Sequence, residues 1–242
     1  MRYFLISLTV IFLLSLPTRS QITLQTGVGI GYVIPSGDFG GSTTDYYNGT
    51  KYGLSNGFNL HGKLRAGLIG VNAIAELGYS ILSNSENSSV GKIEVGQNIL
   101  YMKLGPEFQI EVPAFPLTPY IGGNVTLNNF AGKTTFQGVA RVPSKKYDVK
   151  SAFRLGAGIS GGFLYKLNPL MTIDLSLNYN FMNLTGKKWE DENIEDQRLD
   201  SYLTLNDDKD PLFISLDDDR HFISKSRSIQ TGTIMLSLLF GL

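Results

Sequence analysis

Eight ionisable side chains lie at positions where polar and apolar residues alternate along the chain. They are His61, Lys63, Arg65, Glu76, Lys103, Glu107, Arg154 and Asp174. Alternation with a period of two is typical of a β-strand, whose successive side chains point to opposite faces. Because both signs of charge occur in the set, these groups can pair with one another instead of staying isolated at low dielectric constant. The chemistry to expect is either a set of buried ion pairs or a polar path.

Catalysis by a nucleophile would need a histidine and a carboxylate close by. The chain has two histidines and no cysteine. His61 belongs to the alternating set, and His221 follows an acidic run with Ser215 and Ser224 near it. No catalytic motif connects these residues, and the lack of cysteine excludes a thiolate zinc site. We therefore expect a protein that is not an enzyme and that uses no cofactor or metal.

The stretch between Trp189 and Arg220 is rich in Asp and Glu, for example at 207–210. Calcium prefers such oxygen ligands, but the glycine and the ligand spacing of a calcium-binding loop are absent. We expect a solvated acidic loop, and a cation site stays open as the alternative.

The clearest alternating segment is 171–182, in which every second residue from Met171 to Phe181 is apolar. A tilted strand needs about 9–11 residues to cross a bilayer, and this segment is long enough. Seven other segments share the pattern, so that we expect strands at 22–34, 58–68, 71–82, 100–110, 120–128, 153–165, 171–182 and 229–242. The expected connections are alternately long and short, as in transmembrane barrels. The long ones are 35–57, 83–97, 129–150 and 183–226.

The first residues have the pattern of a secretory signal peptide. A short positive start precedes an apolar run, and Thr18 and Ser20 are small side chains before a cut at Gln21. We predict a signal peptide at 1–20 and a single domain at 21–242.

The charge balance is close to neutral. Removing Arg2 and Arg19 from the 21 basic residues leaves 19 against 21 acidic ones, a net charge of −2. Nucleic acid is therefore not expected as a partner, because binding to it needs a basic face.

Alternation alone does not separate a lipid-facing barrel from a soluble β-sandwich with one apolar face. Glycine is frequent on the polar faces, which the narrow inside of a small barrel favours. Aromatic residues gather near both ends of the apolar faces, as in the girdles of membrane barrels. They are Tyr32, Phe58, Tyr79, Phe153, Tyr179 and Phe181 at one end, and Phe108, Phe163, Tyr165 and Phe240 at the other. We predict an all-β fold, an eight-stranded antiparallel up-and-down transmembrane β-barrel, with a secreted soluble β-protein as the alternative.

Two stretches resemble known outer-membrane proteins. The alternating segment 229–242 resembles their C-terminal assembly signal, although Leu242 replaces the usual terminal aromatic residue. The stretch GVGIGYVIPSGDF at 27–39 is similar to the first strand and loop of the outer-membrane β-barrel domain family. With the signal peptide, the chain resembles the small eight-stranded barrels of the OmpA, OmpX and OmpW kind.

This resemblance implies a porin-like protein of a Gram-negative outer membrane, with both termini in the periplasm. It implies outer-membrane lipid and the barrel-assembly machinery as partners, the latter through the C-terminal strand, and a monomer. Our main hypothesis is a structural or binding barrel whose long outer loops contact an unidentified ligand at the cell surface, as in adhesion. A narrow channel for small solutes is the alternative, and an enzyme acting at the outer rim is a weaker one.

The strand pattern also orders the charges by depth when neighbouring strands run in opposite directions. If the first strand runs outward, Lys63, Glu76 and Lys103 lie near the middle, Arg65, Glu107 and Asp174 lie lower, and His61 and Arg154 lie higher. Because an eight-stranded barrel is just wide enough for its side chains to fill it, we expect an ionic plug more than a path.

Overall fold

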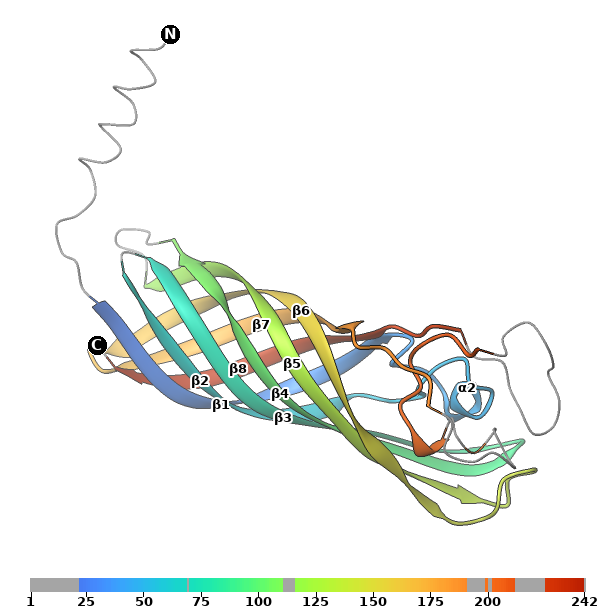
Figure 1. The fold of residues 1–242 in the computed structure, drawn as a ribbon. Helices are drawn as coiled ribbons and strands as arrows, with labels where there is room; N and C mark the ends of the chain where they lie inside the picture. The colour runs from blue at the N-terminus through green and yellow to red at the C-terminus, as the bar shows by residue number, and fades with distance from the viewer. Residues whose placement is uncertain are drawn as a thin grey trace, which may run out of the picture.

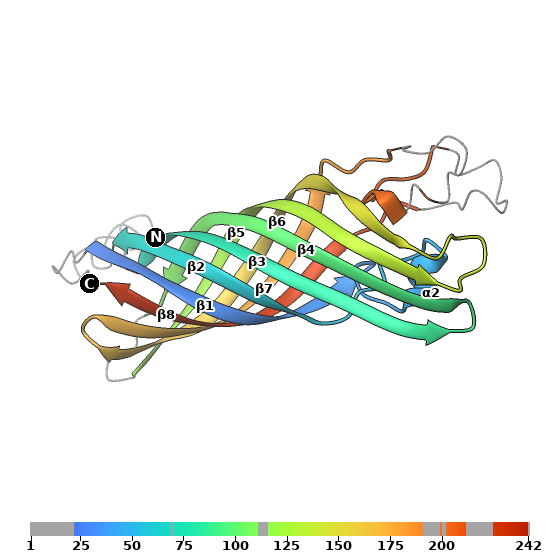
Figure 2. The same cartoon turned by 90° about the horizontal axis from the view of Figure 1, so that it is seen from below.

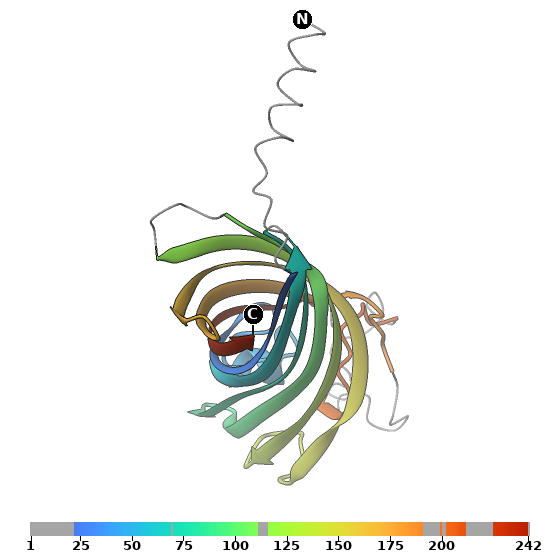
Figure 3. The same cartoon turned by 90° about the vertical axis from the view of Figure 1, so that its left-hand side faces the viewer.

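The computed structural model describes residues 22–68, 70–110, 116–190, 199, 202–211 and 225–241, and its eight strands form one closed barrel. Each strand pairs antiparallel with the next, and the last pairs with the first, as predicted. The strands are β1 (Ile22–Gly37), β2 (Gly57–Leu68), β3 (Val71–Ser88), β4 (Gly91–Gln109), β5 (Leu117–Gln137), β6 (Lys146–Asn168), β7 (Met171–Thr185) and β8 (Ile229–Gly241). Figure 3 shows them curving around a common axis.

The outside of the barrel is apolar over most of its length. Leu60, Leu77, Val125 and Ile159 are each more than half exposed, and the aromatic residues of both predicted girdles are also exposed. We call this outward surface of the eight strands the apolar belt. A belt of this kind with aromatic ends is the lipid-facing surface of a membrane barrel.

Among the described residues, no helix is long and apolar enough to cross a membrane. The predicted signal peptide at 1–20 lies outside the described residues.

Two of the predicted loops are wrong. The segments 83–97 and 129–150 are mostly strand, because β3 and β4 stay paired up to Ser88 and Gly91, and β5 and β6 up to Thr135 and Lys146. Gly91 has a φ of +119°, which suits the tight turn before it. The strands therefore differ in reach at this end of the barrel, and the simple alternation of long and short loops does not hold.

The reason for this error is an inversion of polarity along the strands. Within the apolar belt, the inward positions of β4 hold polar side chains such as Lys103 and Glu107. Beyond the belt, the inward positions hold Ile93 and Val95, which are buried. The outward positions there are polar, as Lys92 illustrates. A strand that passes from lipid into water keeps its period of two but exchanges its polar and apolar faces. Only its lipid-facing part has apolar residues at the outward positions.

This polar-faced extension carries a compact part of the protein, which we call the head. It consists of the described residues in 38–56, 83–97, 130–150 and 199–211, and Figures 1 and 2 show it at the end opposite to the start of β1 and the end of β8. Its core holds side chains from all of these segments, including Phe39, Tyr46, Tyr52, Leu54, Ile93, Val95, Phe130, Phe136, Tyr147, Tyr202 and Leu205.

The helix α2 (Thr43–Tyr47) fixes the first head segment against the barrel. Ser42 caps it, and its hydroxyl accepts a hydrogen bond from the Asp45 amide at 3.1 Å. The Thr43 amide and hydroxyl donate to Glu86 of β3 at 2.9 and 3.0 Å, and these hydrogen bonds lower the pKa of Glu86. Burial raises the pKa of Tyr46 to about 12, so this hydroxyl stays neutral inside the head.

Candidate functional site

The lowest layer of the barrel interior is a neutral group of four charges. Arg65 donates from Nε and Nη2 to the two carboxylate oxygens of Glu107 at 2.7 and 3.0 Å, and its Nη2 also reaches Asp174 at 3.1 Å. Lys63 Nζ lies 2.6 Å from Asp174 and 3.8 Å from Glu107. All four side chains are at most 5% exposed. Lys63 was predicted near the middle, but its long side chain reaches the lower layer, so two cations and two carboxylates balance there.

Two neutral residues complete this layer. The Tyr120 hydroxyl donates to Asp174 at 2.6 Å, and the Gln25 side-chain oxygen accepts from Arg65 at 2.9 Å. Sequence reasoning did not assign them a role, although both lie on the inward parity of their strands. Each satisfies a hydrogen-bonding position that a buried ion needs.

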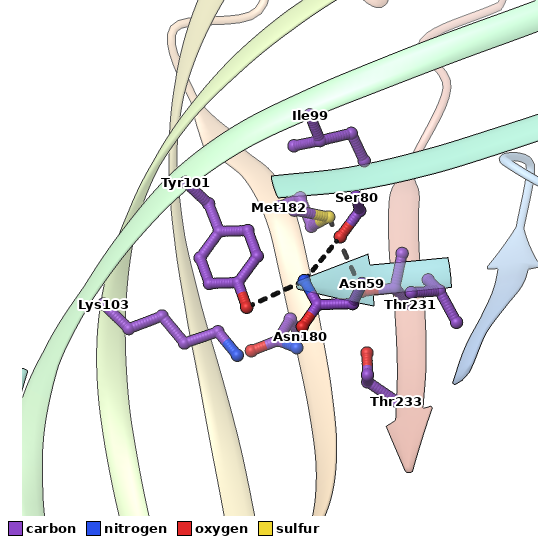
Figure 4. Close-up of a pocket in the computed structure, with 10 residues that line it drawn as sticks. Asn59, Ser80, Ile99, Tyr101, Lys103, Asn180, Met182, Thr231 and Thr233 are labelled. Carbon is purple, nitrogen blue, oxygen red and sulfur yellow. Dashed lines mark hydrogen bonds between the residues drawn. The ribbon is translucent and has the colours of Figure 1, made fainter. Parts of the chain in front are cut away.

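The middle layer contains a second neutral pair. Lys63 stands opposite Glu76 in the register of β2 and β3, but Glu76 accepts its hydrogen bonds from Lys103 at 3.0 Å and from the Tyr101 hydroxyl at 2.8 Å. Figure 4 shows Lys103 and Tyr101 beside Asn59 at a cavity of about 10 Å³. A space of that size holds about one water molecule.

His61 lies between Ser237 and Asn59 in the barrel interior. Its Nε2 lies 2.8 Å from the Ser237 hydroxyl, and its Nδ1 lies 2.9 Å from the Asn59 side-chain oxygen. Gly29 makes room for this group, because a Cβ there would lie 2.5 Å from the Ser237 hydroxyl. The three polar residues are at most 4% exposed, and the cavity beside Asn59 has room for a water molecule only.

Arg154 does not join the other charges, because it lies at the boundary between barrel and head. Its Nε and Nη2 donate to both carboxylate oxygens of Asp207 at 2.6–3.0 Å. Asp207 also accepts from the Asn183 side chain at 2.8 Å and from the Lys188 amide at 3.1 Å, and it is fully buried. Asp207 thus ties the last head segment to the strands.

The prediction of a solvated acidic loop is wrong for part of that segment. Asp207 and Asp210 are buried, and Tyr202 is part of the head core. His221 and Ser215 of the weak triad lie outside the described residues, as does Ser224. In the described part of the chain, no group of three or more His, Cys, Asp or Glu side chains could hold a metal ion.

The comparisons with known proteins agree with the architecture. The family model described as the outer membrane protein beta-barrel domain matches residues 6–201. Neisserial surface protein A (NspA) is similar in structure over 90% of this chain and 97% of its own, with a TM-score of 0.51 and 10% sequence identity. That identity is low enough that the likeness shows the fold alone.

Two other solved structures have lower TM-scores. Ail, the attachment invasion locus protein of Yersinia pestis, has 16% identity and a TM-score of 0.41, with 92% of this chain and 99% of that chain covered. A major outer membrane protein from Thermus thermophilus has 11% identity and a TM-score of 0.49, with coverages of 90% and 99%. No curated protein matches the chain.

Proposed function

The chain belongs to the outer membrane protein beta-barrel domain family, and from this premise we propose that its barrel anchors a head that binds a partner outside the cell. The protein is an outer-membrane β-barrel. In our proposal the head faces the exterior, the start of β1 and the end of β8 face the periplasm, and the protein is a monomer. We also propose that β8 is the strand that the barrel-assembly machinery binds.

The observation that carries this proposal is the packed core of the head. Four strands continue beyond the apolar belt, and residues far apart in the sequence meet on them, for example Phe136 and Tyr202 with ring centroids 4.8 Å apart. A barrel whose only role is to span the membrane does not require a packed hydrophobic core outside the lipid. A rigid scaffold that presents loops is the usual basis of recognition.

The alternative of a narrow channel has less support. The lower charge layer and the Glu76–Lys103 pair lie inside the lumen, where their side chains are at most 5% exposed, and the head core lies over them. The fold and family also resemble those of non-enzymatic outer-membrane barrels, and the burial of His61 and Ser237 gives no reason to propose catalysis.

Binding by the head can be tested with a headless barrel. In this variant, tight turns replace 83–96 and 132–149, and short Gly/Ser linkers replace 38–56 and 186–228. Both proteins would be refolded into phosphatidylethanolamine vesicles and applied to an array of matrix proteins and glycans. We expect the full chain to bind a subset of the array and the headless barrel to bind none, although its hydrogen-bonded ring still inserts into the vesicles.

The control is the change in gel mobility on heating, which reports a folded barrel in both proteins. Equal binding by the two proteins, or no binding by the full chain, would contradict a binding role of the head.

A further inference from the structure

The outer wall of the barrel has a groove within the apolar belt. It has a volume of about 470 Å³ and crosses β6, β7, β8 and the end of β1. Its walls are the exposed side chains of Ile34, Ile159, Leu177, Tyr179 and Ile234. The volume falls in the range of about 300–1,000 Å³ that is usual for small-molecule sites.

Two outward-facing glycines create the groove. Gly161 stands beside Leu177 in the pairing of β6 with β7, and Gly232 stands between Tyr179 of β7 and Ile34 of β1. Nothing fills the space above them, because a Cβ on Gly161 would have its nearest neighbour at 3.6 Å and one on Gly232 at 4.0 Å. Large apolar side chains therefore surround the two glycines, which have no side chain of their own.

Polar side chains lie next to one end of the groove, where Tyr179 is part of its lining. The Tyr179 hydroxyl donates to the Gln230 side-chain oxygen at 2.6 Å and lies 3.3 Å from the Ser36 hydroxyl, and these groups are exposed. Tyr179 belongs to the aromatic girdle on the head side of the belt. The groove therefore runs from a hydrogen-bonding rim into an apolar surface.

We propose that this groove binds one acyl chain of a membrane lipid, with the lipid headgroup at the rim around Tyr179. The groove is continuous with the lipid-facing belt, so the groups that reach it are hydrocarbon chains. An extended peptide would bring unpaired backbone N–H and C=O groups into lipid, where no water can satisfy them.

Native mass spectrometry after extraction from phosphatidylethanolamine vesicles tests this site. The variant Gly161→Leu/Gly232→Leu fills the groove where the structure has free space. The matched control is Gly62→Leu, because Gly62 also faces outward with open space above it, its nearest atom being the Gly27 carbonyl oxygen at 3.8 Å. Heat-modifiable gel mobility verifies that each variant is folded.

We expect the wild type and Gly62→Leu to retain one phosphatidylethanolamine molecule, and the fraction with bound lipid to fall about tenfold in the double variant. Three results would overturn the proposal. They are a wild type without retained lipid, equal retention by the double variant, and a wild-type dimer that the double variant loses, which would assign the groove to a second copy of the chain.

Discussion

Replacing Arg65 by alanine should lower the free energy of unfolding by about 3–5 kcal/mol, because the buried Glu107 loses both of its hydrogen bonds to the guanidinium and Asp174 loses one of its two cations. Arg65 is fully buried and contacts both Glu107 and Asp174. After its loss, Lys63 is the one cation of this layer and must serve two carboxylates. Urea unfolding of the barrel in lipid vesicles would measure the change.

Asp174→Asn is the comparison for this variant. Because Lys63 and Arg65 together balance the two carboxylates, the substitution leaves one positive charge in excess. We still expect a smaller loss than for Arg65→Ala, because Glu107 continues to hold Arg65 through two hydrogen bonds. A loss for Asp174→Asn as large as that for Arg65→Ala would contradict this ordering.

A double variant separates pairing from packing. Arg65→Met with Glu107→Gln removes one cation and one carboxylate together and leaves Lys63 with Asp174. Its cost should fall well below the sum of the two single losses, because coupled residues of one network are not additive. Additive losses would mean that the charges of this layer do not act as a unit.

Asp207→Ala should release the last head segment while the barrel stays folded. The change leaves the side chain of Arg154, which is 5% exposed, without its carboxylate partner. It also removes the hydrogen-bond acceptor of the Lys188 amide. Breaking a buried pair of this kind typically costs about 3–5 kcal/mol, which is large for a single loop. Limited proteolysis of the vesicle-bound protein should then cleave within 199–211, where the wild type resists.

Asp208→Ala is the matched control, because Asp208 carries the same charge one residue later but is exposed. We expect its proteolysis to match that of the wild type. Identical cleavage of the Asp207 and Asp208 variants would show that the bond to Arg154 does not hold the segment.

The transmembrane part of the fold could be predicted from the sequence because the outward positions of a barrel strand must be apolar where they face lipid. All eight strands and the closed ring follow from apolar outward positions, and Met171–Thr185 begins where its pattern begins. Even Pro106 stays within β4 without a register shift, although proline usually weakens a strand. The alternating strand directions placed Arg65, Glu107 and Asp174 at one level, where the structure has Arg65 in contact with both carboxylates.

The head could not be predicted in this way. Its strands exchange polar and apolar faces when they leave the lipid, so Ile93 and Val95 looked like parts of a loop. Its core also depends on contacts between distant segments, such as the hydrogen bond from the Tyr52 hydroxyl to the Leu205 carbonyl at 2.9 Å. The partner of Arg154 was missed for the same reason, because no periodicity marks Asp207 among the other acidic residues of its loop.

Single-channel recording in a planar bilayer is the most direct test of a barrel that is closed and acts through its head. Wild-type protein and Glu76→Gln would be inserted under the same conditions, with folding verified by gel mobility before and after heating. We expect no conductance steps from either protein, because the ion pairs at two levels of the lumen are almost fully buried. A steady conductance of the wild type that changes in Glu76→Gln would contradict this account and favour a channel.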